Sequence, residues 1–209
     1  GDAMTTGANN TIVGYAAGTT LTTGGANVFV GYDAGKDQTT AGASTFVGDH
    51  AGANVTTGAN NTFVGYYAGL NVTTGANNVL IGYNAGDAIT DASSNVAVGQ
   101  NALSADTTGV QNTAIGMHSL KSSTTAANNV AVGYKAGEDL TTATNCVFMG
   151  YQAGANVTTG NNNTLIGLNA GDAITTSPSN TLIGHNAGSA ISTGSGENVC
   201  IGNNAAASM

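Results

Sequence analysis

The sequence predicts an all-β fold, a parallel β-solenoid of about twelve seventeen-residue coils. Three observations support it: a fixed repeat, a glycine-rich composition and a short apolar strand in every repeat. A fixed short period along a whole chain is typical of stacked units that gain a core only from their neighbours. Anchor glycines mark the repeat at intervals of seventeen residues, the last interval alone being eighteen: Gly14, Gly31, Gly48, Gly65, Gly82, Gly99, Gly116, Gly133, Gly150, Gly167, Gly184 and Gly202.

No change of period and no linker divides the chain, so residues 1–209 are predicted to form one repeat domain. The first six residues match residues 171–176 in register, which means that the sequence starts in the middle of a repeat. Solenoids normally need terminal caps. We therefore expect this sequence to be a segment of a longer protein.

The composition narrows the classes of partner. The net charge is −8 and Lys36, Lys121 and Lys135 are the only bases, so we expect no binding of nucleic acid or anionic lipid. No run approaches the roughly 18 apolar residues of a membrane span, so no membrane insertion of this segment is expected. Cys146 and Cys200 lie three repeats apart, about 14 Å in such a stack, which is too far for an intrachain disulfide.

The three residues before each anchor glycine form the predicted strand, as in Thr62-Phe63-Val64 before Gly65. The first and third residues are β-branched in nearly every repeat and share one face, whereas the middle residue lies on the other. Both faces are thus apolar, and a single coil covers only one of them, which favours a homo-oligomer. We assign the oligomer interface to the middle column, whose largest members are Phe29, Phe46, Phe63, Leu80, Phe148, Leu165 and Leu182.

The volumes of two columns are correlated. Where the middle strand residue shrinks to Ala97 and Ala114, the glycine four residues after the anchor becomes Leu103 and Leu120. One column is expected to fill the space that the other leaves. The second limb of the repeat carries an apolar residue and then two threonines, as in Leu21-Thr22-Thr23, and it predicts a second short strand that ends in a Gly-rich turn.

Polar columns have mainly structural interpretations. An Asn precedes most strands, as at Asn61 and Asn78, and stacked amides of this kind bond to one another and cap turns. The doubled threonines form two hydroxyl ladders that suggest ice binding, but ice-binding strands present Thr-x-Thr, because neighbouring residues of a strand point to opposite sides. Hydrogen bonding along the ladder is therefore the favoured role.

Tyrosines follow the anchor glycine in about half of the repeats, and two interpretations stay open. A stripe of rings could bind a cell-surface glycan or protein receptor, or the rings could pack at a corner with their hydroxyl groups in water. The columns that follow vary in chemistry, as at Asp33, His50 and Lys135, and are expected to face solvent, where recognition would occur. The candidate recognition residues are Tyr15, Tyr32, Tyr66, Tyr67, Tyr83, Tyr134 and Tyr151.

No nucleophile, base and orienting group recur at a consistent spacing, so we expect no catalytic residues and a protein that is not an enzyme. His50, His118 and His185 are about four coils apart, too far to share a metal ion. The isolated carboxylates Asp87 and Asp91 are weak candidates for calcium, and solvation is their simpler role. We therefore assign no metal site and no cofactor.

The motifs Asn95-Val96-Ala97-Val98-Gly99-Gln100-Asn101-Ala102 and Asn129-Val130-Ala131-Val132-Gly133-Tyr134-Lys135-Ala136 resemble the head repeats of trimeric autotransporter adhesins. They are also similar to the Asn-Thr-x-x-Gly-Tyr-x-Ala-Gly repeats of phage tail fibres, and the likeness covers the whole chain. The resemblance implies a left-handed parallel β-roll assembled as a homotrimer, although seventeen residues exceed the period of about fourteen in the adhesin heads.

The expected function is that of a non-enzymatic structural or adhesive fibre segment, in a phage tail fibre or bacterial adhesin, presenting repeated contacts to a host surface. Its expected location is extracellular, on a cell surface or a virion. Two alternatives stay open. One is a self-assembling extracellular filament, and the other is an ice-binding β-solenoid that uses the Thr ladders.

Overall fold

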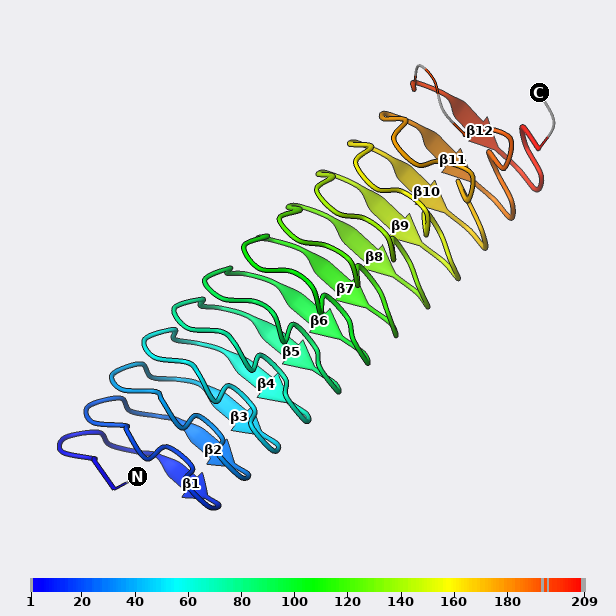
Figure 1. Cartoon of the computed structure of the whole chain (residues 1–209). Helices are drawn as coiled ribbons and strands as arrows, with labels where there is room; N and C mark the ends of the chain where they lie inside the picture. The colour runs from blue at the N-terminus through cyan, green and yellow to red at the C-terminus, as the bar shows by residue number, and fades with distance from the viewer. Residues whose placement is uncertain (1, 193, 195, 208–209) are drawn as a thin grey trace.

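The computed structural model describes residues 2–192, 194 and 196–207, and these residues form a parallel β-solenoid (Figure 1). Twelve three-residue strands lie in one sheet in the order of the sequence, and every neighbouring pair is parallel. The prediction of an all-β parallel solenoid is confirmed. The strands are β1 Thr11–Val13, β2 Val28–Val30, β3 Thr45–Val47, β4 Thr62–Val64, β5 Val79–Ile81, β6 Val96–Val98, β7 Thr113–Ile115, β8 Val130–Val132, β9 Val147–Met149, β10 Thr164–Ile166, β11 Thr181–Ile183 and β12 Val199–Ile201.

The register places equivalent residues of successive repeats side by side. Phe63 of β4 pairs with Phe46 of β3 on one side and with Leu80 of β5 on the other. The ladder is maintained by backbone bonds such as that from the Gly65 N–H to the Val47 carbonyl, 2.8 Å long. Each column of the sequence therefore becomes a straight row on the molecule, and adjacent members of a row are about 4.8 Å apart.

The middle residue of each strand points into its own coil. From β2 to β11 this side chain is completely buried within a single chain, whereas the first and third residues are partly or fully exposed. The interface assigned to Phe29, Phe46, Phe63, Leu80, Phe148, Leu165 and Leu182 is therefore wrong. The physical reason is volume, because a coil of seventeen residues needs one large side chain at its centre and the β-branched residues of the other two columns are too short to fill it.

The core is a continuous row of side chains along the axis. Phe29 stacks on Phe46, and where the row shrinks to Ala97 and Ala114, the predicted compensation is confirmed: Leu103 and Leu120 are fully buried. Both leucines adopt a left-handed backbone, with φ of 57° and 48°, at positions that are glycine in most other coils. At those other positions a larger residue would collide with the core, since a Cβ on Gly69 would lie 2.6 Å from the Phe63 ring.

The second limb does not form the predicted strand in any coil that the structure describes. The Thr22 N–H donates to the Thr39 carbonyl of the next coil at 2.8 Å, but the preceding Leu21 N–H donates within its own coil to Gly18 at 3.2 Å. Because one N–H is used locally, the backbone of this limb turns instead of extending. The limb still contributes to the core through Leu21 and its equivalents, which are buried.

The Asn column forms the predicted amide ladder. The Asn78 N–H donates to Oδ1 of Asn61 at 2.9 Å, and Nδ2 of Asn61 donates to the Gly75 carbonyl at 2.8 Å. Both side chains are fully buried, so the ladder satisfies backbone groups that the short strands leave unpaired. Cys146 occupies one position of this column, and both Cys146 and Cys200 are free thiols, as their separation predicted.

The anchor glycine is required by two features of the turn after each strand. Gly65 has φ of +139°, a conformation that residues with a Cβ rarely adopt. A Cβ at Gly65 would also collide with the carbonyl oxygen of Gly82 in the next coil. This close approach of backbones explains why the seventeen-residue mark is always glycine. The described residues include no helix that is long and apolar enough to cross a membrane.

Candidate functional surfaces

The first candidate surface is the outer face of the sheet, which consists of the first and third residues of strands β1–β12. Every residue in this outer face is Thr, Val, Ile or Met, so it carries no charge. Several of its members are well exposed, among them Val13 at 59% and Met149 at 42%. Large exposed apolar patches mark interaction sites in soluble proteins.

Sequence reasoning identified this face as apolar but not as the exposed one. The alternation of side chains along a strand placed Val64 and Phe63 on opposite sides of β4. Because both residues are apolar, hydropathy alone did not show which side faces the interior of the coil. The side-chain volumes do distinguish the buried face from the exposed one. The middle column varies from Ala to Phe in step with Leu103 and Leu120, as residues that share a closed interior must, whereas the outer columns keep nearly constant volume.

The second candidate surface is the tyrosine column. Tyr15 and Tyr32 stack with centroids 5.2 Å apart, Tyr66 and Tyr83 stack at 5.5 Å, and Tyr134 and Tyr151 stack at 5.1 Å. Five of the six are between 42% and 74% exposed, and Tyr134 is half-buried. The structure thus places the candidate recognition residues in one row at the corner after the strands, except Tyr67, which belongs to the next column and stacks on Tyr66 at 4.0 Å.

The stacking decides which parts of these rings are accessible. The rings of Tyr66 and Tyr83 are nearly parallel, with 6° between their planes, so each covers a face of the other. What remains open is the ring edges and the hydroxyl groups. A side-chain hydrogen bond with Tyr67 raises the pKa of Tyr66 to about 12, so the hydroxyl group of Tyr66 is uncharged at neutral pH. Such a row offers hydrogen bonds to a ligand along its edge.

The third candidate surface is a polar stripe formed by the second and fifth residues after each anchor glycine. In the second coil, Nζ of Lys36 lies 3.5 Å from Oδ2 of Asp33, and Nε2 of His50 in the third coil lies 3.7 Å from the same oxygen. In the eighth coil, Lys135 contacts Glu138 at 2.9 Å. His118 of the seventh coil contacts the same carboxylate at 3.2 Å. Asp33 and Glu138 of this stripe therefore each form an ion pair with a lysine of the chain itself.

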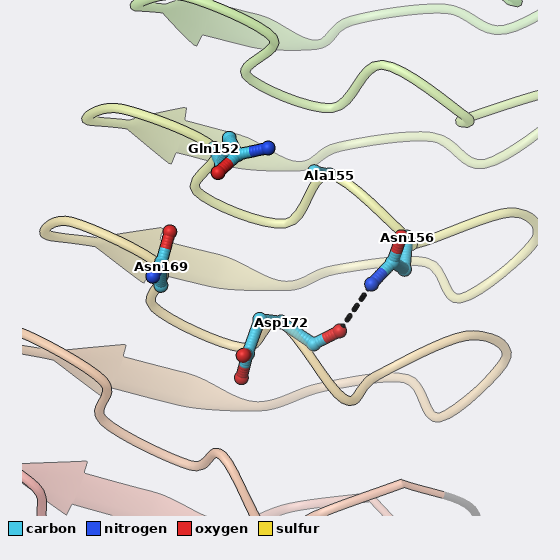
Figure 2. A pocket seen from close by; sticks show the side chains of 5 residues that line it. All are labelled: Gln152, Ala155, Asn156, Asn169 and Asp172. Carbon is cyan, nitrogen blue, oxygen red and sulfur yellow. Dashed lines mark hydrogen bonds between the residues drawn. The ribbon is translucent and has the colours of Figure 1, made fainter.

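A hollow of about 170 Å³ opens in the polar stripe between the ninth and tenth coils (Figure 2). It is lined by Gln152, Ala155, Asn156, Asn169 and Asp172. Nδ2 of Asn156 donates to the backbone carbonyl of Asp172 at 2.6 Å, and the Asp172 carboxylate points away from Asn156. The Oδ1 atom of Asp172 is buried without a hydrogen-bond partner. The sequence analysis named Asp87, the equivalent of Asp172 five coils earlier, as a weak candidate for calcium, but it did not connect either Asp with the Asn three residues before it.

The two threonine rows lie on the second limb. The first row bonds along the axis, as Thr56 Oγ1 does in donating to the Thr73 carbonyl at 3.1 Å, which is the role favoured by the sequence. The second row, with Thr57 and Thr74, is exposed. The first threonine row therefore adds hydrogen bonds between successive coils, and the second row places its hydroxyl groups at the surface.

The described residues contain no group of three or more His, Cys, Asp or Glu side chains that could hold a metal ion. One buried acid lies in the core: Asp106, which accepts hydrogen bonds from Ser123 Oγ at 2.9 Å and from the Gly109 N–H at 2.6 Å. Burial raises the pKa of Asp106 to about 6. Its partners are a neutral hydroxyl and the backbone, and it faces the interior of the coil, so its position indicates a role in stability.

Comparison with known proteins finds no match to this sequence among protein-family models, curated proteins or solved structures. Function is therefore inferred from the three surfaces themselves. Of these, the outer face of the sheet runs along the whole row of strands (Figure 1).

Proposed function

We propose that this chain is a non-enzymatic segment of an extracellular fibre, a phage tail fibre or a bacterial surface adhesin, and that it assembles as a homotrimer through the outer face of its sheet. The observation that carries the proposal is the uncharged, exposed outer face, which continues without interruption from β1 to β12. Because parallel rows of Val and Ile leave apolar area in water, association of like chains would be favourable.

The dimensions of the outer face fit a specific interface. Twelve strands at a spacing of about 4.8 Å make a strip about 50 Å long, and three residues span about 10 Å across it. The projected area is about 500 Å², and protruding side chains raise the accessible area toward the roughly 800 Å² that each partner contributes to a standard interface. The rod geometry also suits a fibre, because each coil adds length without changing the cross-section.

The mass of the protein in solution tests the assembly. Sedimentation equilibrium over a dilution series should give three times the 20.3 kDa chain mass. Val64→Asp or Ile81→Asp should shift the mass to that of one chain while the circular dichroism spectrum is retained, because these residues lie on the outer face. Thr57→Asp adds the same charge on the exposed second limb and should leave the trimer intact. A monomer in the unmodified chain would overturn the assembly, and open-ended growth would favour a stacking filament.

Adhesion would come from the other two surfaces. The tyrosine column presents a ring in six of its twelve positions and the polar stripe presents polar groups along the same side, so a glycan or protein receptor would be held by several weak contacts whose avidity grows with their number. Binding of the chain to a glycan array or to host cells should fall when Tyr66 and Tyr83 are both changed to Ser. It should be unchanged by Thr57→Ser, and equal binding by the tyrosine variant would argue against that surface.

Ice binding is a second candidate function. The outer face of the sheet supports it better than the threonine rows do, because the outer face is formed by strands. The strands expose Thr or Val followed by Val, Ile or Met at regular spacing, a flat array of methyl and hydroxyl groups. Thermal hysteresis measured on a monomeric preparation would support this function. Its absence, together with a trimer that covers the face, would reject it.

A further inference from the structure

A local arrangement in the polar stripe occurs twice, five coils apart. Residues 68–90 and 153–175 are closely similar in sequence, and both contain the run Asn-Ala-Gly-Asp-Ala-Ile-Thr. Each run places an Asn and an Asp three residues apart, Asn84 with Asp87 and Asn169 with Asp172. We call these the Asn-x-x-Asp pairs. In both cases the next coil carries Asn and Ser at the equivalent positions, and these are Asn101, Ser104, Asn186 and Ser189.

The backbone at the two pairs is held in the same way. Nδ2 of Asn71 donates to the carbonyl of Asp87 at 2.9 Å, and Nδ2 of Asn156 donates to the carbonyl of Asp172 at 2.6 Å. The Asn of each pair has the same left-handed backbone, with φ of 52° at Asn84 and 53° at Asn169. The next coil is bonded in register, since the Asn101 N–H donates to Tyr83 and the Asn186 N–H donates to Leu168, both at 2.9 Å. Oxygen-bearing side chains of two coils therefore lie about one coil spacing apart at both places.

The pairs contain buried oxygen atoms with no partner. Oδ1 of Asn84, Oδ1 of Asp87 and Oδ1 of Asp172 are sealed from solvent and accept no hydrogen bond. Leaving a buried acceptor unpaired is costly, and more so for a carboxylate. Desolvation raises the pKa of Asp87, and a hydrogen bond from its own backbone N–H only partly opposes this. These groups lack a ligand that would compensate their burial.

Other carboxylates of the same stripe have such a ligand. Asp33 contacts Lys36, and Glu138 contacts Lys135, in each case through a residue three positions away. At the corresponding distance from Asp87 and Asp172 the chain has Asn84 and Asn169, which supply an amide and no charge. Within the described part of the chain, no Lys or His lies within 4 Å of either carboxylate. Asp33 and Glu138 of the stripe thus each lie beside a lysine, whereas Asp87 and Asp172 do not.

We propose that each Asn-x-x-Asp pair binds one calcium ion, with the Asp carboxylate and the Asn amide oxygen as ligands and with oxygen atoms of the next coil and water completing the shell. Carboxylate, amide and hydroxyl oxygens are the donors that hard divalent cations take. The donor set mixes carboxylate, amide and hydroxyl oxygens, which suits the flexible six- to eight-fold coordination of Ca²⁺ better than the strict octahedron of Mg²⁺. The net charge of −8 attracts such ions to the surface.

One carboxylate per site predicts weak binding, in the range of about 10⁻⁴ to 10⁻³ M that extracellular modules show. The proposal does not depend on the fibre assembly, since all of its ligands come from one chain and none belongs to the outer face of the sheet. If calcium binds at these pairs, the stability of the solenoid depends on calcium at the fifth and tenth coils.

Equilibrium dialysis of the full chain against Ca²⁺ alone, up to about 10 mM, tests the proposal. We expect two ions per chain, one after Asp87→Asn, one after Asp172→Asn and none after both changes. Asp91→Asn removes the same charge at an exposed position four residues after Asp87, and should keep both ions. Circular dichroism establishes that each variant is folded, since Asn preserves the size of the side chain.

Two results would overturn the assignment. The first is binding of fewer than one ion per chain at the highest concentration. The second is binding that falls equally in Asp87→Asn and Asp91→Asn, because this would identify a diffuse ion atmosphere attracted by net charge. A supporting second measurement is thermal unfolding, in which Ca²⁺ should raise the Tm of the unmodified chain and leave the Tm of the double variant unchanged.

Discussion

The ring of Phe46 stacks on the ring of Phe63 in the next coil, with centroids 4.9 Å apart and 14° between the planes. Phe29 continues the row below them, so three phenylalanines form one continuous column inside successive coils. Each ring contacts the coil before it and the coil after it. The core of this protein is therefore a linear array in which one side chain supports two interfaces.

Replacement of one ring should weaken both interfaces. Phe63→Ala is expected to lower the free energy of unfolding by about 3 to 5 kcal/mol, because it leaves a cavity between β3 and β5. Chemical denaturation followed by circular dichroism measures the change. The oligomer interface assigned from the sequence would give a different result, loss of assembly with the coil intact, and that result would contradict the buried position of Phe63.

A second change should restore part of this loss. In Phe63→Ala combined with Gly69→Leu, the leucine would enter the space left by the ring, as Leu103 does beside Ala97. Gly69→Leu alone should be destabilising, because a Cβ there meets the Phe63 ring at 2.6 Å. A double-mutant cycle should therefore give a favourable coupling of about 1 to 3 kcal/mol. Additive effects would mean that the two columns do not share one space.

The amide ladder provides a third prediction. Asn78→Ala removes the acceptor of the Asn95 N–H and the donor to the Ala92 carbonyl, so it should cost about 2 to 3 kcal/mol of unfolding free energy. Asn78→Ser should cost less, because Ser44 in the same column still accepts a bond from the Asn61 N–H at 3.4 Å. Hydrogen exchange of the Asn95 amide checks the mechanism, since only the loss of its acceptor should accelerate that amide specifically.

Asp106 gives the stability a dependence on pH. Its pKa is raised to about 6 by burial, above the ordinary 3.8, so the folded chain holds a proton between about pH 4 and 6 that the unfolded chain has released. Stability should consequently fall as the pH rises through this window, by on the order of 2 to 3 kcal/mol. Asp106→Asn should remove this fall, and Asp91→Asn should retain it, in urea titrations at pH 4 and pH 7. A parallel loss in both variants would assign the effect to net charge.

The sequence was sufficient for the repeat, the strand positions, the parallel register and the compensation between Ala97 and Leu103. All of these depend on period and volume, which a single chain displays directly. The direction of the strand faces was predicted wrongly, because Val64 and Phe63 are both apolar and hydropathy does not distinguish inside from outside. The second limb was predicted as a strand from its apolar residue and the two threonines that follow it, but the Leu21 N–H is used in a local turn instead of a ladder.

The functional surfaces were predictable to different degrees. Tyrosines at a fixed position had to form a row, but their stacking depends on the spacing of the coils and could not be read from composition. The Asn-x-x-Asp pairs gave almost no signal, since Asn is common in this chain and each pair contains only one carboxylate. They become distinct only when the structure shows that Asp87 and Asp172 have no cation beside them while Asp33 has one.

The in-register pairing of every strand with its successor has a consequence for how such a chain can change over generations. Recombination between repeats of the gene that adds or removes one whole unit would insert or delete one coil and leave every other pairing as it was. Length would then vary in steps of about 4.8 Å. The eighteen-residue interval between Gly184 and Gly202 also keeps its pairing, with Leu182 beside Cys200. The length of such a solenoid can therefore change while its fold stays the same.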